Sequence, residues 1–143
     1  MTDLVVDASV AIKWFVAEPD ALAAERLLRV TNNLAAPRLL LTEIANGLRK
    51  NFFRKTIRRE TVFASLSEAG RLIDTWHEDA PLLEEALEMS LTLNHPIYDC
   101  IYLSLARSLG AVCITADERL VGKVAGTKFA RLTVGLTEWE QTS

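Results

Sequence analysis

The sequence predicts an α/β fold with a central parallel sheet flanked by helices on both faces. Two short apolar runs, at about residues 3–7 and 111–115, have the continuous pattern of strands that are buried on both sides. The segments between them carry apolar residues at helical spacing. Strands that alternate with helices form parallel sheets, because each helix provides the crossover to the next strand.

The first half of the chain predicts a second strand and several helices. A helix or turn is expected at about residues 9–15, and Asp20 is positioned to cap the helix that follows the break at 18–20. Residues 35–37 end a short strand or lead straight into the next helix. In that helix a core stripe is predicted from Leu41, Ile44, Ala45, Leu48 and Phe52.

The second half predicts two helices at 61–72 and 81–93, the second begun by a proline. A further helix is predicted to start at Pro96, because proline is favoured at the first helical position. It is predicted to stop at Gly110, because glycine readily adopts the left-handed conformation that ends helices. A last edge strand is expected at 129–132.

Composition indicates one globular domain spanning residues 1–143. Hydrophobic residues make up 50% and charged residues 24% of the chain, which excludes a disordered class. The longest apolar stretches are far shorter than a membrane span, and acids interrupt the N-terminus where a signal peptide would need a basic and then apolar segment. We therefore expect a cytoplasmic protein. Cys100 and Cys113 lack metal-binding or redox spacing and are interpreted as buried thiols.

Four acids suggest a site at one edge of the sheet. Asp7 and Asp117 follow the two apolar strands, so both should emerge at the carboxyl ends of parallel strands, where open α/β sheets bind ligands. Glu43 and Asp99 lie in helical patterns that can turn toward the same edge. Converging carboxylates repel one another unless cations neutralise them, and Mg²⁺ or Mn²⁺ prefers such oxygen ligands. The set indicates a metal-dependent enzyme acting on phosphate.

The net charge of −3, taken alone, argues against nucleic-acid binding. The charge is unevenly distributed, however, because residues 49–59 form a basic stretch. The stretch contains no acid and includes Phe52 and Phe53, and aromatic and cationic groups together suit RNA bases and phosphates. An ordinary solvated helix end is the alternative. The RNA-binding candidates are Arg49, Lys50, Arg54 and Lys55.

The ordered set of motifs resembles the PIN-domain ribonucleases, specifically VapC-type toxins of type II toxin–antitoxin systems. The motifs are the segments Asp7-Ala8-Ser9, Glu43 followed by Asn46, Tyr98 to Leu103, and Thr115-Ala116-Asp117. The resemblance implies a PIN-like fold, divalent-metal dependence and endonucleolytic RNA cleavage. It also implies a homodimer and a cognate VapB-type antitoxin that sends a basic side chain into the acidic pocket.

The resemblance carries the family's metal-site acids onto Asp7, Glu43, Asp99 and Asp117. Asp7 and Asp99 would bind the metal directly and Asp117 directly or through water, whereas Glu43 would ligate a second ion or take a proton from the attacking water. The supporting residues are Ser9 and Thr115, whose hydroxyls would hold the acids or a water, and Asn46, which would orient substrate.

Other functions stay open at this point. His77 and His95 could cleave RNA through the 2′-hydroxyl without a metal, although a structural role is expected for each. A phospho-acceptor receiver domain also gathers acids at strand ends, but the further acid and the lysine it needs are not evident. Each acid taken singly could also serve as a helix cap or turn residue. The main alternative is a non-catalytic PIN-fold module that binds RNA or a partner protein.

Overall fold

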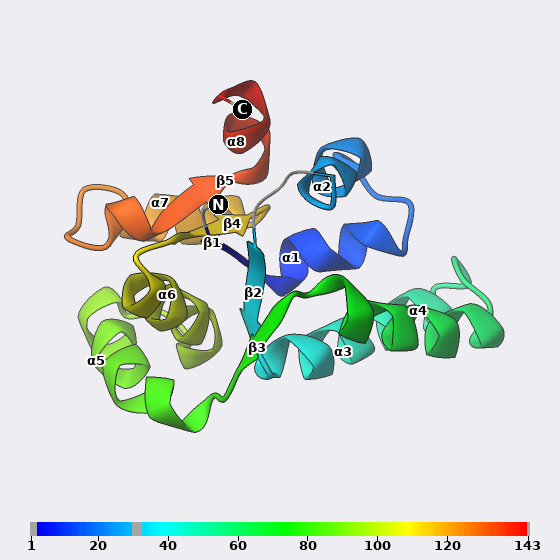
Figure 1. Ribbon diagram of the computed structural model, residues 1–143, viewed down its shortest axis with the longest axis horizontal. Helices are drawn as coiled ribbons and strands as arrows, with labels where there is room; N and C mark the ends of the chain where they lie inside the picture. Colours follow the sequence, from blue (N-terminus) through cyan, green and yellow to red (C-terminus); the bar gives the residue numbers. More distant parts are fainter. Residues whose placement is uncertain (1–2, 30–32, 143) are drawn as a thin grey trace.

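A computed structural model describes residues 3–29 and 33–142 of the chain. Its centre is a five-stranded, entirely parallel sheet in the order β3-β2-β1-β4-β5 (Figure 1). The predicted α/β class with a parallel sheet is therefore confirmed. The strands are β1 (Asp3–Val6), β2 (Asn33–Pro37), β3 (Thr75–His77), β4 (Val112–Thr115) and β5 (Thr133–Gly135).

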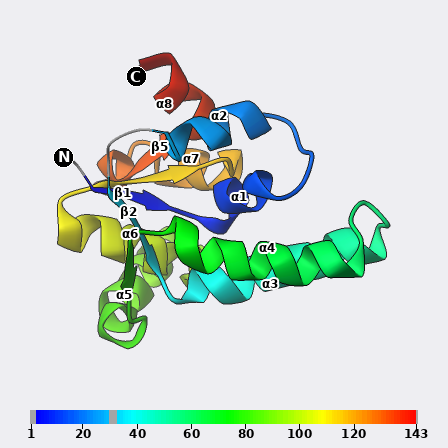
Figure 2. The same cartoon turned by 45° about the vertical axis from the view of Figure 1, so that its right-hand side comes forward.

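Helices cover both faces of this sheet. One helix, α6, contacts the three inner strands β2, β1 and β4, and α5 packs outside it. Figure 2 shows α2 and α8 on the opposite side, and α3 and α4 as a long hairpin that extends beyond the sheet. The helical segments are α1 (Ala8–Ala11), η1 (Ile12–Trp14), α2 (Ala21–Leu27), α3 (Leu39–Phe53), α4 (Arg59–Leu72), η2 (Ala80–Leu82), α5 (Leu83–Leu93), α6 (Ile97–Leu109), α7 (Glu118–Val124), η3 (Ala130–Leu132) and α8 (Leu136–Thr142).

The register of the inner strands fixes where their carboxyl ends lie. Val6 of β1 pairs with Ile114 of β4, and the backbone N–H of Asp7 donates to the carbonyl of Ile114 at 3.4 Å. The residues after β1 and the last residue of β4, Thr115, therefore share one edge of the sheet. This is the edge at which open α/β sheets bind ligands.

Two predicted features of the helices were wrong in detail. The buried stripe of α3 runs through Leu40, Ile44 and Leu48, while Leu41 and Ala45 are half-buried and line a groove shared with α4. The reason is that α3 has a second helical partner, so its apolar surface spans two faces. Asp20 precedes α2, but its backbone is left-handed (φ 66°) and its side chain forms no capping hydrogen bond.

The C-terminal edge of the sheet also differs from the prediction. The edge strand lies at Thr133–Gly135, and residues 130–132, expected in the strand, form the short helix η3 instead. Phe129 is buried although it belongs to no strand. Its apolar side chain therefore resembled the start of a strand in the sequence. The sequence pattern also did not predict the three-residue strand β3, which pairs with β2.

Two further expectations can be compared with the structure. Cys100 and Cys113 are both buried free thiols, as predicted. Among the described helices of residues 3–29 and 33–142, none is long and apolar enough to cross a membrane.

Candidate active site

Asp7 lies at the carboxyl end of β1, where the strand gives way to α1. Its Oδ1 accepts hydrogen bonds from the hydroxyl of Ser9 at 2.6 Å and from the N–H of Val10 at 3.3 Å, so it also caps α1. Burial raises the pKa of Asp7 from 3.8 to about 6, and the nearby charge of Asp99 adds to the rise, whereas the Ser9 and Thr115 hydroxyls oppose it. The fold thus holds this carboxylate in an environment that disfavours its charge.

Hydroxyl groups connect Asp7 to the loop after β4. The Oγ of Ser9 lies 3.3 Å from Oγ1 of Thr115 and accepts the backbone N–H of Ala116 at 2.9 Å. Thr115 in turn accepts the N–H of Asp117 at 3.0 Å. The hydroxyls of Ser9 and Thr115, both predicted as supporting residues, therefore lie between Asp7 and Asp117 and connect the ends of β1 and β4.

Glu43 lies on α3 and is held by a residue of α6. The hydroxyl of Tyr102 donates to Oε1 of Glu43 at 2.5 Å. Burial raises the pKa of Glu43, the Tyr102 bond lowers it, and the charges of Asp99 and Asp79 raise it further. Glu43 is thus half-buried and specifically bonded, unlike the solvated glutamate of an ordinary helix flank.

Asp99 occupies the first turn of α6 and influences both other acids. Its charge contributes to the raised pKa of Asp7 and to that of Glu43. Its own Oδ2 lies 2.5 Å from Nε2 of His95, which precedes the helix. The charge of Asp99 on α6 therefore acts on one acid from α3 and on one at the end of β1.

Asp117 lies at the same sheet edge but is engaged differently. Its Oδ1 accepts the N–H of Arg119 at 2.9 Å and caps α7, and the Arg119 guanidinium lies 3.6 Å away. It is not among the charges that raise the pKa of Asp7 or Glu43. Its connection to Asp7 runs through the Thr115 and Ser9 hydroxyls.

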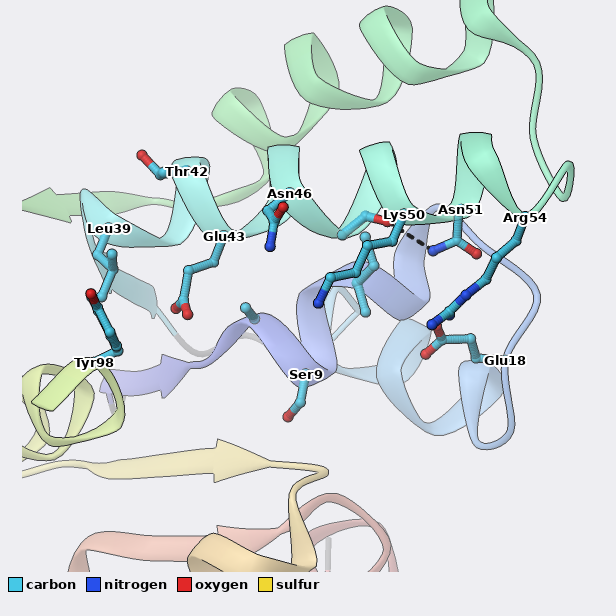
Figure 3. A pocket seen from close by; sticks show the side chains of 13 residues that line it. Ser9, Glu18, Leu39, Thr42, Glu43, Asn46, Lys50, Asn51, Arg54 and Tyr98 are labelled. Atoms are coloured by element: carbon cyan, nitrogen blue, oxygen red, sulfur yellow. Dashed lines mark hydrogen bonds between the residues drawn. The ribbon is translucent and has the colours of Figure 1, made fainter. Parts of the chain in front are cut away.

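A groove of about 680 Å³ leads away from the acids along α3. In Figure 3, Glu43, Lys50 and Arg54 point from α3 toward the side occupied by α1, and Arg54 reaches toward Glu18. These positions recur at helical spacing and so share one face of α3. The groove is lined by Ala8, Ser9, Ile12, Glu18, Leu39, Thr42, Glu43, Asn46, Gly47, Lys50, Asn51, Arg54 and Tyr98.

The basic stretch divides between this groove and other surfaces. Lys50 and Arg54 line the groove, whereas Lys55 lines a separate hollow of about 390 Å³ with Phe52 and Phe53. Arg49 stacks its guanidinium over the Phe53 ring, 5.0 Å from the centroid. The four candidates therefore do not form one surface.

The acids are the candidate ligands for the divalent ion predicted from the sequence. Within residues 3–29 and 33–142, no three His, Cys, Asp or Glu side chains are grouped closely enough to hold one metal ion. The donors nevertheless fit such an ion chemically, because carboxylate oxygens are its preferred ligands. The raised pKa values of Asp7 and Glu43 show that the pocket disfavours negative charge, which a cation would offset.

Tyr102 and His95 are partners of the acids that the sequence interpretation did not identify. Tyr102 is 1% exposed, and a buried tyrosine hydroxyl needs a hydrogen-bond partner. Its position about one turn after Asp99 in an apolar helix is the sequence signal that its hydroxyl could contact a site acid. His95 was interpreted as structural because it precedes Pro96. Its spacing of four residues from Asp99 was the signal that it could reach this acid.

Known proteins resemble this chain in sequence and in fold. The PIN domain family model matches residues 4–126. Ribonuclease VapC3 of Pyrobaculum aerophilum is 30% identical over 122 residues, which are 84% of this chain and 93% of that protein.

Among solved structures, PAE2754 from Pyrobaculum aerophilum superimposes with a TM-score of 0.73 at 24% identity, covering 99% of this chain and 88% of that one. VapC20 of Mycobacterium tuberculosis, a toxin that cleaves the sarcin–ricin loop, gives a TM-score of 0.67 at 19% identity and covers 90% and 98%. These two likenesses concern the fold. The sequence matches show that the chain belongs to the PIN-domain family and is a relative of the VapC ribonucleases.

Proposed function

We propose that the protein is a divalent-metal-dependent endoribonuclease that acts as the toxin of a toxin–antitoxin pair and hydrolyses RNA phosphodiester bonds. The observation that carries this proposal is geometric: hydroxyl groups join Asp7 to the Asp117 loop at the ligand-binding edge of the sheet, and Tyr102 holds Glu43 by a hydrogen bond. Family membership supports RNA cleavage as the reaction class, since relatives of this chain such as ribonuclease VapC3 and ribonuclease VapC1 are ribonucleases.

In the proposed site, Asp7 and Asp99 would hold Mg²⁺ or Mn²⁺ directly, and Asp117 directly or through water. A bound divalent ion supplies Lewis-acid stabilisation of the charge that develops on phosphate oxygens. Glu43 would ligate a second ion or accept a proton from the attacking water. Within the described residues its hydrogen bond engages Oε1, which leaves Oε2 available for that proton.

The remaining site residues hold these acids or bind the substrate. Ser9 and Thr115 fix the positions of Asp7 and the Asp117 loop through their hydroxyls. Asn46, Lys50 and Arg54 line the groove beside Glu43 and would contact the RNA strand. Arg49 and Lys55 point to other surfaces and would contribute less.

The same acidic pocket gives a physical reason for the proposed antitoxin. A cognate VapB-type antitoxin would place a basic side chain among the acids, because a guanidinium can neutralise carboxylates in place of a metal. A homodimer is proposed for the toxin from the family resemblance alone.

The test is cleavage of total cellular RNA by antitoxin-free protein in Mg²⁺, Mn²⁺ or EDTA. Discrete fragments should require the metal and disappear in Asp99→Asn, which removes a ligand without changing side-chain volume. Asp3→Asn, the same change at the opposite end of β1, is the matched control and should cleave like the wild type.

The chemistry of the new RNA ends separates the proposal from its rivals. Attack by water leaves a 5′-phosphate and a 3′-hydroxyl, whereas attack by the ribose 2′-hydroxyl leaves a cyclic phosphate. Cyclic ends formed in EDTA would favour His77 and His95 instead. Tight RNA binding without cleavage in any metal would favour the non-catalytic module.

A further inference from the structure

The junction between α5 and α6 places the ring of His95 against Asp99. Nε2 of His95 and Oδ2 of Asp99 are 2.5 Å apart, and the two side chains are only 13% and 28% exposed. A carboxylate oxygen accepts hydrogen bonds, so the His95 tautomer with its proton on Nε2 is the one suited to this contact. One of the two oxygens of Asp99 is thereby engaged from within the protein.

Ser90 holds the backbone of His95 on both sides. The N–H of His95 donates to the carbonyl of Ser90 at 3.2 Å, and the hydroxyl of Ser90 donates to the carbonyl of His95 at 2.5 Å. Between them Asn94 is left-handed (φ 51°) and ends α5. Pro96, whose ring restricts φ, follows directly. These local contacts therefore fix the turn before α6 begins and with it the position of the His95 backbone, from which the imidazole extends.

We propose that His95 is a positioning residue for the metal site. By donating to Oδ2, it would hold the Asp99 carboxylate in one orientation and leave its other oxygen for the divalent ion, and the Ser90 hydroxyl would support this by holding the His95 carbonyl. The inference rests on the proposed function, because Asp99 must be a metal ligand for its orientation to matter. Residues that hydrogen-bond to ligating groups are known to affect metal affinity by about 10- to 100-fold.

A simpler role for the contact makes a different prediction. A hydrogen bond between residues four positions apart at a helix start can stabilise α6 without any effect on a bound ion. In that case removal of the ring lowers thermal stability while metal affinity stays unchanged. The affinity of the protein for metal, measured in the absence of RNA, therefore distinguishes a role of His95 in orienting Asp99 from a role in stabilising α6.

The experiment is a titration of antitoxin-free protein with Mn²⁺, with the free ion followed by electron paramagnetic resonance. His95→Ala should weaken binding about 10- to 100-fold. His95→Gln should restore most of the affinity, because the side-chain amide offers an N–H close to the place of Nε2. Ser90→Ala retains the ring and the bond from the His95 N–H but removes the hydroxyl that holds the His95 carbonyl, so its affinity should fall between those of the wild type and His95→Ala.

Two controls make each outcome decisive. His77→Ala removes the other histidine, which lies on β3, and should bind Mn²⁺ like the wild type. Asp99→Asn should lose binding. Circular dichroism and a thermal melt identify any variant that fails to fold, in which case His95→Gln and Ser90→Ala carry the test.

Full affinity in His95→Ala, alongside loss in Asp99→Asn, would overturn this inference and leave the proposed function intact. Equal weakening in folded His95→Ala and His95→Gln would also overturn it, because the N–H would then not be the operative group. Wild-type protein that binds no Mn²⁺, or Asp99→Asn that binds normally, would overturn the metal site and the inference together.

Discussion

The hydroxyl of Tyr102 on α6 donates a hydrogen bond of 2.5 Å to Oε1 of Glu43 on α3, across 59 residues of sequence. Tyr102 is 1% exposed, and burial and the charge of Glu43 raise its pKa well above 10, so it stays protonated and acts as the donor. The contact joins the two helices that carry Glu43 and Asp99. It fixes one acid of the candidate site relative to another.

Tyr102→Phe should destabilise the protein and shift its activity toward higher pH. Loss of a hydrogen bond to a charged group lowers the free energy of unfolding by about 1.5–3 kcal/mol. Because the bond lowers the pKa of Glu43, its removal should raise that pKa and move the acid limb of the cleavage profile upward. Urea unfolding and cleavage rates across pH measure the two effects.

Tyr98→Phe is the matched control for this prediction. Tyr98 is 58% exposed and lines the groove beside Glu43, so the same atom is removed near the same site. Stability and the pH profile should stay close to those of the wild type. An equal shift in both variants would contradict a specific role for the Tyr102 hydroxyl.

Asp7→Asn should stabilise the metal-free protein, and more so at neutral pH than at acidic pH. The folded-state pKa of Asp7 is about 6 against 3.8 in a model compound, so protonated Asp7 favours the fold below about pH 4, and this benefit is lost as pH rises through 6. A shift of this size corresponds to about 3 kcal/mol at pH 7.5. Chemical unfolding in EDTA at several pH values measures it.

The same variant should lose its response to metal. Addition of Mn²⁺ should stabilise the wild type and leave Asp7→Asn unchanged, because the ion then has one ligand fewer. Asp3→Asn serves as the control and should respond to Mn²⁺ as the wild type does. A stability difference between wild type and Asp7→Asn that stays constant from pH 4 to pH 7.5 would count against the raised pKa.

Ser9→Ala should cost about 1–3 kcal/mol of stability, because it leaves the N–H of Ala116 without its acceptor and removes a bond to Asp7. The pKa of Asp7 should rise further, since the Ser9 hydroxyl lowers it. Urea unfolding measures the first effect. Ser108→Ala, which removes a hydroxyl that donates to the carbonyl of Leu105 in its own helix, should change stability far less.

Neutralising both groove cations should weaken RNA binding and reduce its dependence on salt. Lys50→Gln with Arg54→Gln removes two candidate phosphate contacts, and the salt slope should fall by about 1.4, at about 0.7 for each contact with a single strand. Fluorescence anisotropy with labelled RNA across a salt series measures this. All variants carry Asp99→Asn so that the RNA stays intact.

Arg49→Gln with Arg59→Gln is the charge-matched control for the groove. Both guanidinium groups lie over phenylalanine rings, those of Phe53 and Phe63, and neither lines the groove. The salt slope should change little. Equal loss in both double variants would mean that RNA follows the whole basic stretch and not the groove alone.

The features best predicted from sequence are those with a local physical cause. Pro96 and Gly110 bound α6, although Pro96 is the N-cap with an extended ψ of 140° and not the first helical residue as predicted, and β4 follows from a continuous apolar run. The strands β3 and β5 have three residues each at the two edges of the sheet. Such three-residue segments are too short to show a burial pattern, so the sequence does not predict β3 and places β5 a few residues too early.

For the site, the sequence by itself determined which acids follow strands or open helices, because strand ends and caps are set within a few residues. Only the tertiary structure decided that Tyr102 holds Glu43 and that Lys50 and Arg54 share a groove with it, while Arg49 stacks elsewhere. These relationships depend on how α3 packs against its neighbours. No local pattern specifies them, because hydrogen bonds and burial across distant segments arise only when the core is assembled.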